Sequence, residues 1–269
     1  MQLKWQLSLG KQILTNLNIK TMKKLLILPI CIVIAFVACK KDKTPNEEKE
    51  VVKGNIKQVT ETVNGITYKI FTGINTTNFK GILVVGSGND ENDPSEGAID
   101  GAAETALCEK AASNGYAAAI VKYQKPAAGA DWNSRAKLMG EDFNKAILGI
   151  SSKYGIDKNK SVLAGFSYTS FMLFTDISLN PTLSYTKGLL GACGATGTWN
   201  AQNFKIPIFA INCSGNNEGN FNGKALYDQI PANSPIKAKS EGVTDNSCNS
   251  HCGGDWTDKM YTKMVAWLQ

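Results

Sequence analysis

The side chain best placed to do chemistry in this 269-residue chain lies in the run Gly165-Phe166-Ser167-Tyr168-Thr169. The run follows an apolar segment, residues 161–165, that is typical of a buried strand, and it precedes a segment predicted to be helical. A serine at a sharp turn from strand to helix exposes its hydroxyl above the sheet, and the amides at the helix N-terminus face any negative charge that develops there. We therefore predict that Ser167 is a nucleophile, the alternative being a turn serine without a role.

The run matches the pattern G-x-S-x-G, typical of such nucleophilic turns, except at its last position, where Thr169 replaces glycine. Threonine is larger than glycine, so close packing of the helix against the strand must be relieved elsewhere.

A serine hydroxyl is a poor nucleophile unless a base accepts its proton. The chain contains one histidine, His251, which excludes every mechanism that needs two. His251 follows the last predicted strand and precedes the final predicted helix, which suits a general base acting on Ser167. The alternative is a surface or core histidine without a catalytic role.

A tetrahedral intermediate formed on a serine needs backbone N–H groups around its oxyanion. Tyr168, directly after the nucleophile, is expected to supply one. The loop Gly86-Ser87-Gly88-Asn89 follows an apolar strand, and its small residues allow the backbone to approach a ligand, so Ser87 or Gly88 is expected to supply the other. The loop is not a dinucleotide-binding G-x-G-x-x-G motif, because Glu91 stands at the last glycine position.

Periodicity and turn residues predict the elements that position these groups. Asn64-Gly65 between two β-rich runs indicates a hairpin. The predicted strands are residues 59–63, 66–71, 81–86, 116–122, 161–165, 187–192, 206–212 and 236–240. The predicted helices are residues 102–113, 134–154, 168–178 and a closing helix capped by Asp255, with Met260, Met264 and Trp267 facing inward.

A hairpin followed by alternating strands and helices predicts an α/β fold. We expect a mostly parallel twisted sheet with an N-terminal antiparallel hairpin and helices on both faces. The connections are short, so residues 52–269 are expected to form one domain. No long insertion separates the strands at 187–192 and 206–212, which leaves no room there for a helical lid.

The turn at Ser167, its flanking strand and helix, and the late histidine resemble the α/β-hydrolase family over residues 57–269. The lid-free layout is most similar to small esterases of the dienelactone-hydrolase and cutinase or polyesterase kind. The resemblance implies the α/β-hydrolase fold. It also implies that Tyr168 and Trp199 line the substrate cleft, the alternative for both aromatic residues being ordinary packing.

The same resemblance implies a third catalytic residue, an acid that orients the imidazole and follows the strand at 206–212. Glu218 is the only acidic residue between Asp176 and Asp228, and it is expected to fill this role. Asp245 is the second candidate, and an exposed loop glutamate without a role is the alternative for Glu218.

Cysteine usage suggests an exported protein that can form disulfides. Cys31 falls in a predicted leader and Cys39 in a predicted lipidation site. The five other cysteines are Cys108, Cys193, Cys213, Cys248 and Cys252. An odd number leaves at least one free, and Cys108, on an apolar helical face, is expected to be the free, buried one.

The segment Cys248-Asn-Ser-His-Cys252 could close a small disulfide loop, although four cysteines allow three pairings that sequence does not distinguish. A zinc site built from Cys248, His251 and Cys252 is the alternative. It is disfavoured because structural zinc takes four ligands and the chain has no second histidine. We expect neither a metal nor an organic cofactor.

The N-terminal segment resembles a bacterial lipoprotein leader. Met22-Lys23-Lys24 precedes a 14-residue apolar run that ends at Ala38, which is short for a membrane span, and Cys39 stands at the acylation position. We expect residues 1–38 to be a leader with Met22 as the real start, and residues 39–51 to be a charged tether. A buried or transmembrane helix is the alternative. Lys40 after Cys39 favours the outer over the inner membrane of the cell envelope.

The net charge and the order of the candidate catalytic residues limit the classes of function that fit the sequence. Beyond residues 1–39, 24 basic and 23 acidic residues leave a net charge of +1, which argues against nucleic-acid binding. The sequence predicts a serine esterase that cleaves small or polymeric carboxylic esters. The alternatives are a peptidase of the same fold and a catalytically inactive lipoprotein binding module.

Overall fold

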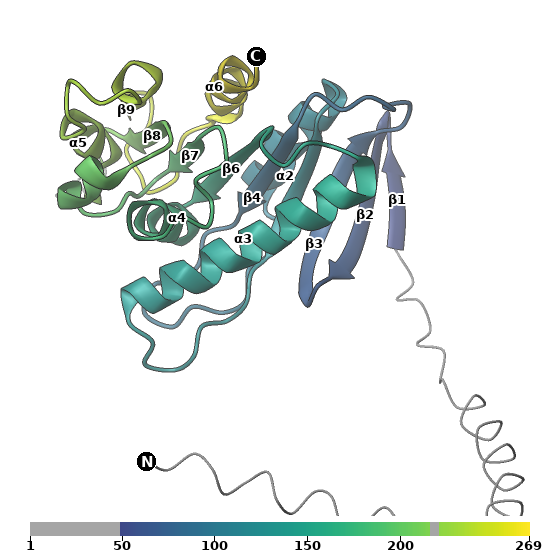
Figure 1. Cartoon of the computed structure of the whole chain (residues 1–269), viewed down its shortest axis with the longest axis horizontal. Helices are drawn as coiled ribbons and strands as arrows, with labels where there is room; N and C mark the ends of the chain where they lie inside the picture. Colours follow the sequence, from purple (N-terminus) through teal and green to yellow (C-terminus); the bar gives the residue numbers. More distant parts are fainter. Residues whose placement is uncertain (1–48, 216–220) are drawn as a thin grey trace, which may run out of the picture. The chain divides into compact units, whose positions relative to one another are not determined.

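The computed structural model describes residues 49–215 and 221–269, and these residues form a sheet of nine strands with helices on both faces (Figure 1). The strands are β1 (Lys49–Lys53), β2 (Ile56–Val63), β3 (Ile66–Gly73), β4 (Ile82–Gly86), β5 (Ala117–Lys122), β6 (Ser161–Phe166), β7 (Leu189–Ala192), β8 (Ile208–Cys213) and β9 (Glu241–Asp245). The helices are α2 (Ala102–Ser113), α3 (Trp132–Tyr154), α4 (Tyr168–Leu179), α5 (Gly223–Asp228) and α6 (Thr257–Leu268).

The strands lie in the order β1-β2-β3-β5-β4-β6-β7-β8-β9. The predicted hairpin is confirmed: Val63 pairs with Ile66, and the turn residues Asn64 and Gly65 have φ of 54° and 79°, the left-handed region that Asn-Gly adopts readily. β3 pairs antiparallel with β5, and every pair from β5 to β9 is parallel. The predicted fold class is therefore confirmed.

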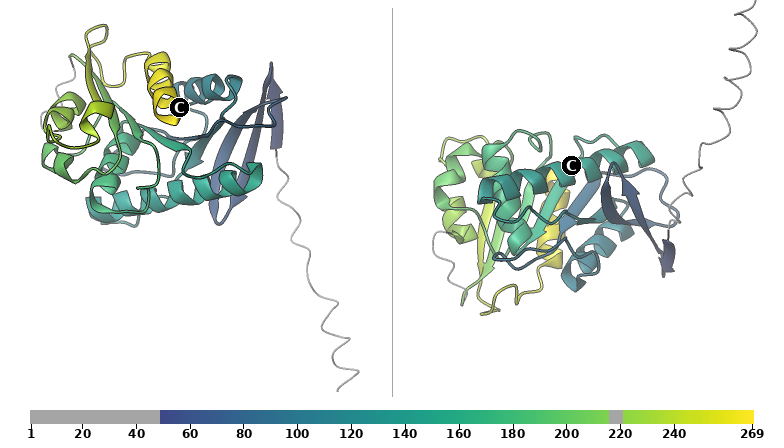
Figure 2. Two further views of the ribbon diagram at one scale, coloured as in Figure 1. Left: turned by 45° about the horizontal axis from the view of Figure 1, so that its top comes forward. Right: turned by 90° about the horizontal axis from the view of Figure 1, so that it is seen from below.

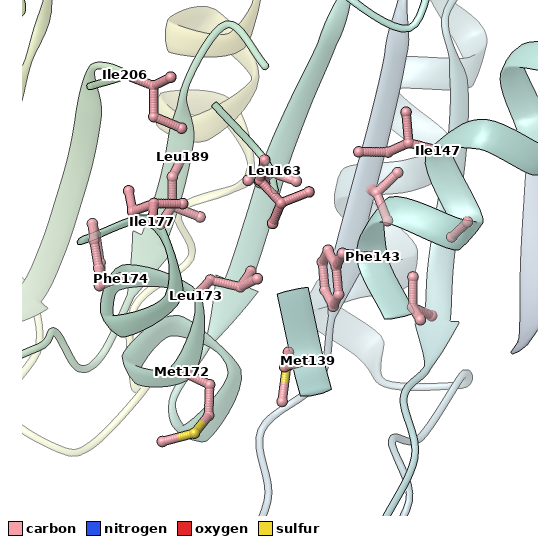
Figure 3. Packing of buried hydrophobic residues seen from close by; sticks show 14 of the residues in the cluster. Met139, Phe143, Ile147, Leu163, Met172, Leu173, Phe174, Ile177, Leu189 and Ile206 are labelled. Atoms are coloured by element: carbon pink, nitrogen blue, oxygen red, sulfur yellow. The ribbon is translucent and has the colours of Figure 1, made fainter. Parts of the chain in front are cut away.

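The central strands are buried on both faces because each face is covered by helices (Figure 2). Alternate residues of β4 show this division: Ile82 and Val84 join one core with α3 and α4, whereas Leu83 and Val85 join the other with α2 and α6. Figure 3 shows the first core, where side chains of α3 and α4 pack onto β6 and β7. These two cores pack against the two faces of the sheet.

The last predicted strand is wrong. Residues 237–239 form a single turn of 3-10 helix, and the last strand, β9, follows it. β9 is an edge strand with mostly exposed or half-buried side chains, so it lacks the apolar run that marks the central strands. Ser240 lies between the two segments, and its hydroxyl links the start of β8 to the 3-10 turn, because it accepts a hydrogen bond from Ile208 N and donates to the Ile236 carbonyl.

The closing helix begins later than predicted. Trp256 occupies the N-cap position, while the predicted cap, Asp255, accepts a hydrogen bond from Thr257 N at 3.2 Å. Met260 and Met264 are fully buried, as expected, and Trp267 is half-buried with its indole N–H donating to the Lys239 carbonyl.

Strand β1, helix α5 and a 3-10 helix at Thr198–Asn203 were not predicted. All three are short, and β1 and α5 are rich in charged or polar residues, so their apolar periodicity is weak.

The predicted leader and the lipidation site at Cys39 lie outside the described residues, and β1 overlaps the last residues of the predicted tether. Within residues 49–215 and 221–269, no helix combines the length and hydropathy needed to cross a membrane.

Candidate active site

Ser167 lies at the turn between β6 and α4, at the carboxyl edge of the parallel strands. Its φ of 51° is rare for a residue with a side chain, and its N–H donates to the Ala192 carbonyl at 2.8 Å. Gly165 permits the sharp turn, because a Cβ there would lie 2.7 Å from Ser170 N. The local fold thus holds the Ser167 hydroxyl above the sheet edge, as predicted from the sequence.

The packing problem posed by Thr169 is relieved on the neighbouring strand β4. Thr169 is fully buried, and a Cβ on Gly86 would collide with its methyl group. The Thr169 hydroxyl donates to the Ser87 carbonyl at 2.6 Å. Gly86 on the neighbouring strand thus provides the space that the Thr169 side chain needs, and the threonine joins the turn at Ser167 to the loop after β4.

His251 lies in the segment between β9 and α6, and its Nε2 is 2.8 Å from Ser167 Oγ. The two side chains are 84 residues apart in sequence and meet because β6 and β9 both end at the same edge of the sheet. His251 is exposed and Ser167 is half-buried, so the pair is open to a substrate.

Disulfides hold the His251 segment on both sides. Cys248 bonds to Cys213 at the end of β8, and Cys252 bonds to Cys193 just after β7. Cys248 and Cys252 are thus both in disulfides, as expected, but the small loop between them, one of three pairings left open by the sequence, does not form. Each of these cysteines finds its partner at a different strand end, a proximity that only the sheet creates.

The expectation for Cys108 is confirmed, since it is a free, fully buried cysteine of α2. Burial, with a smaller contribution from nearby Glu104, raises the pKa of the Cys108 thiol well above its usual range. This side chain therefore behaves as a small apolar residue of the core.

The residues of the zinc alternative do not fit a metal. Cys248 and Cys252 are both in disulfides and offer no thiolate. A second grouping, Cys193, His251 and Cys252, has its ligand atoms within 4.8 Å of one another, but its two sulfurs are bonded to each other.

The preferred third residue, Glu218, lies outside the described residues. The second candidate, Asp245, is buried at the end of β9 and accepts hydrogen bonds from Lys259, Ser247 and the indole N–H of Trp256. These contacts, led by Lys259, hold the pKa of Asp245 well below its usual range. Asp245 thus joins the start of the His251 segment to α6.

The loop after β4, which the sequence predicts to bind an oxyanion, lies against Ser167. A Cβ on Gly88 would lie 3.1 Å from Ser167 Cβ, which explains the glycine. Ser87 is buried, and its carbonyl accepts from the Tyr123 hydroxyl as well as from Thr169. The backbone of this loop is therefore fixed beside Ser167 before any substrate arrives.

Glu104, a buried acid in the first turn of α2, was not predicted from the sequence. Burial raises its pKa, and backbone hydrogen bonds from Glu104 itself and from Gly88 oppose this rise. Glu104 therefore lies close to the loop after β4 that is expected to bind the oxyanion. The only feature of the sequence that could have pointed to Glu104 is its place in the first turn of a predicted helix, where an acidic side chain is favoured.

The two predicted cleft aromatics differ in exposure. Tyr168 is buried with its ring centroid 6.3 Å from that of Tyr123, and burial raises the pKa of Tyr168 to about 12. Trp199, on the 3-10 helix after β7, is 62% exposed. Of the two rings, only that of Trp199 is available to a ligand over most of its surface.

Trp199 belongs to a row of four aromatic rings that the sequence did not reveal. The consecutive centroid distances are 5.3 Å for Trp132–Phe171, 5.4 Å for Phe171–Phe221 and 6.1 Å for Phe221–Trp199. Phe171 N donates to the Ser167 carbonyl, so this inner member of the row lies one helical turn from Ser167. We call these four residues the aromatic row.

No protein-family model matches the chain, and no curated protein sequence matches it. Solved structures do resemble it, but their sequence identities are so low that the likeness shows the fold alone. A putative dienelactone hydrolase from Klebsiella pneumoniae has a TM-score of 0.54 at 12% identity, covering 79% of this chain and 98% of its own. A lid-free α/β serine hydrolase from Xanthomonas campestris has a TM-score of 0.54 at 10% identity, covering 81% and 98%.

Dipeptidyl peptidase 4 from Porphyromonas gingivalis also resembles the chain, with a TM-score of 0.54 at 14% identity, over 79% of this chain but only 35% of the peptidase. These structural neighbours are hydrolases and include both esterases and a peptidase. The sheet order, the flanking helices and this likeness together show that the chain has the α/β-hydrolase fold.

Proposed function

We propose that this protein is a serine hydrolase that cleaves carboxylic esters through an acyl-enzyme. The observation that carries the proposal is the 2.8 Å distance between Ser167 Oγ and His251 Nε2 at a strand-to-helix turn. A hydroxyl in hydrogen-bonding distance of an imidazole, on the exposed edge of a parallel sheet, is the arrangement that nucleophilic catalysis requires.

In the proposed reaction, Ser167 Oγ attacks the ester carbonyl while His251 Nε2 accepts its proton. The negative charge that forms on the carbonyl oxygen is stabilised by the backbone N–H groups of Tyr168 and of the loop at Ser87 and Gly88, an effect of about 2.7–4 kcal/mol per donor in enzymes of this kind. His251 then returns the proton to the leaving alcohol, and water repeats the sequence on the acyl-enzyme.

An acid must orient His251 so that Nε2 faces the serine. Glu218 remains our proposal for this role, because it follows β8 in the sequence. The hydrogen bonds of Asp245 with Lys259 and Trp256 give that acid a structural role, which favours Glu218 over it.

The aromatic row supports esters with an apolar or aromatic group on one side of the scissile bond. Trp132, Trp199 and Phe221 are 44%, 62% and 41% exposed, and Phe171 connects Trp132 to the other two, so the row presents a continuous apolar surface. Such a surface, one helical turn from Ser167, would gain free energy by covering an apolar group of the substrate.

A peptidase of the same fold is the second candidate, favoured by the likeness to dipeptidyl peptidase 4. This chain corresponds to only 35% of that protein. An inactive binding module is the third candidate, and the close approach of Ser167 to His251 argues against it. We also propose that the protein is an exported lipoprotein anchored through Cys39, on the sequence pattern alone.

A fluorophosphonate probe tests the proposal directly, because it reacts with a serine whose hydroxyl is activated by a base. We expect the full chain to be labelled at Ser167, with labelling abolished in Ser167→Ala and strongly reduced in His251→Gln. Short p-nitrophenyl esters should be hydrolysed and peptide p-nitroanilides should not. A folded protein that remains unlabelled would overturn the hydrolase proposal, and preferred cleavage of the anilides would favour the peptidase.

A further inference from the structure

Two disulfides hold the segment that carries His251, and they lie at different distances from this residue in the sequence. Cys248 precedes His251 by three residues, whereas Cys252 follows it directly. We propose that the Cys193–Cys252 disulfide is a positioning group of the active site: it holds the imidazole of His251 within reach of Ser167. The inference rests on the proposed roles of this serine and histidine.

The end of β7 provides a common frame for both catalytic side chains. The Ala192 carbonyl accepts the Ser167 N–H at 2.8 Å, which holds the nucleophile turn. Cys193 follows Ala192 directly, and its sulfur is bonded to that of Cys252, the residue after His251. A single hydrogen bond and a single disulfide therefore connect the nucleophile and the base to adjacent residues of one buried strand end.

The backbone at both ends of this disulfide adopts a conformation that its side chains disfavour. Cys193 has a φ of 50° and Cys252 a φ of 52°, in the left-handed region where a Cβ crowds the backbone. Among the described residues, only Asn64 and Ser167 are other non-glycine residues with positive φ. Cleavage of the disulfide would allow both cysteines to return to negative φ, and rotation at Cys252 would move the adjacent His251.

The second disulfide lacks these features. Cys213 and Cys248 have ordinary φ, and hydrogen bonds from Ser214 N and Oγ to the Cys248 carbonyl join the same two segments without the sulfur bond. Loss of Cys213–Cys248 should therefore displace His251 less than loss of Cys193–Cys252. The chain thus offers a matched control.

The Cys193–Cys252 bond has one exposed and one buried end. A dithiol reductant can attack Cys252 Sγ as a thiolate, which breaks the disulfide and expels Cys193 as a thiolate that then takes a proton. The second thiolate of the reductant then displaces Cys252 and forms the reductant's own disulfide. The protein gains two electrons and two protons, and its two cysteines become thiols.

The first experiment compares Cys193→Ala/Cys252→Ala with Cys213→Ala/Cys248→Ala in the full chain. For a short p-nitrophenyl ester, we expect kcat to fall at least tenfold in the first variant with KM within twofold, because the base is displaced while the binding surface remains. The second variant should keep at least half of the wild-type kcat. Equal losses of kcat in the two variants would overturn the inference.

Reduction after folding avoids variants that fail to fold. Dithiothreitol should inactivate the folded Cys213→Ala/Cys248→Ala variant at least tenfold, and oxidised glutathione should restore its activity. Retention of full activity after complete reduction, verified by thiol counting, would overturn the inference.

A readout that does not need turnover uses the fact that the chain has one histidine. With ¹³C-labelled histidine, the His251 ring gives one Cε1–Hε1 NMR signal. Ser167→Ala should shift this signal when Cys193–Cys252 is intact and leave it unchanged when the bond is reduced. An equal shift in the intact and reduced states would contradict the positioning role. If the signal shifts only in the intact state but the protein does not hydrolyse esters, the positioning role is supported and only the proposed function is refuted.

Discussion

The hydroxyl of Thr169 joins two parts of the candidate active site that are far apart in sequence. It donates to the Ser87 carbonyl, so the turn that carries Ser167 and the loop proposed to bind the oxyanion share a buried hydrogen bond. A glycine at position 169 would leave the loop without this contact. At the scale of single residues, the departure from G-x-S-x-G therefore connects Ser167, the proposed nucleophile, to the loop proposed to bind the oxyanion.

We predict that Thr169→Val, which keeps the side-chain shape but removes the hydroxyl, lowers kcat several-fold with little change in KM. The free energy of unfolding should fall by about 1–2 kcal/mol, because a buried acceptor on Ser87 loses one of its donors. Steady-state kinetics and urea unfolding measure both effects. Thr169→Ser is the control and should stay close to wild type, and a Val variant with unchanged kcat would refute the role of the hydroxyl.

The contact between helices α3 and α4 contains a buried acid. Asp176 of α4 is fully buried against Gly140 of α3, where a Cβ on the glycine would collide with its carboxyl group. Its Oδ1 accepts from Asn180, and Oδ2 has no hydrogen-bond partner. Burial raises the pKa of Asp176 to about 7, against an ordinary value of 3.8.

Because the folded-state pKa of Asp176 is raised, its protonated form is favoured in the folded protein. The contribution of this group to stability is fully present below about pH 4 and is lost as the pH rises to about 7, by up to about 4 kcal/mol for three pKa units. We predict that Asp176→Asn removes this decline, so that the variant gains stability over wild type between pH 4.5 and pH 8. Urea unfolding at the two pH values tests this.

Asp258 of α6 is exposed, and Asp258→Asn is the control for removal of a charge. This variant should show the same difference in the free energy of unfolding between pH 4.5 and pH 8 as wild type. The same pH dependence in Asp176→Asn and wild type would show that Asp176 ionises in the folded protein without a stability penalty.

At the scale of the whole molecule, the aromatic row brings together rings from α3, α4, the 3-10 helix after β7 and the segment before α5. No two of its members lie within one helix or strand, so the row exists only in the folded chain. Its outer rings, Trp132 and Trp199, are separated by Phe171 and Phe221, which makes the apolar surface several side chains long.

We predict that Trp199→Ala lowers kcat/KM for esters with long acyl chains or aromatic groups at least fivefold and leaves that for p-nitrophenyl acetate within twofold. The reason is that a short ester does not reach the row, so it loses no buried apolar contact. Kinetics across p-nitrophenyl esters of increasing acyl length measure the effect. Leu179→Ala, an exposed apolar residue at the far end of α4, is the control, and equal losses for short and long esters in Trp199→Ala would refute the prediction.

Sequence alone determined the class of fold and two members of the candidate site. The hairpin at Asn64-Gly65, the apolar central strands and the long helix α3 carry strong local patterns, because a strand buried on both faces and a helix packed on one must be apolar at fixed spacing. Ser167 was found from its strand-turn-helix context, and His251 because no other imidazole competes for the role.

Only the tertiary structure decided which cysteines pair, where the last strand runs, that Gly86 makes room for Thr169 and which aromatic rings meet. Each of these depends on the parallel strands ending at one edge of the sheet, which brings together residues that are dozens of positions apart. A local pattern records the environment of a side chain but not the identity of its distant neighbour, so these contacts leave no periodic trace in the sequence.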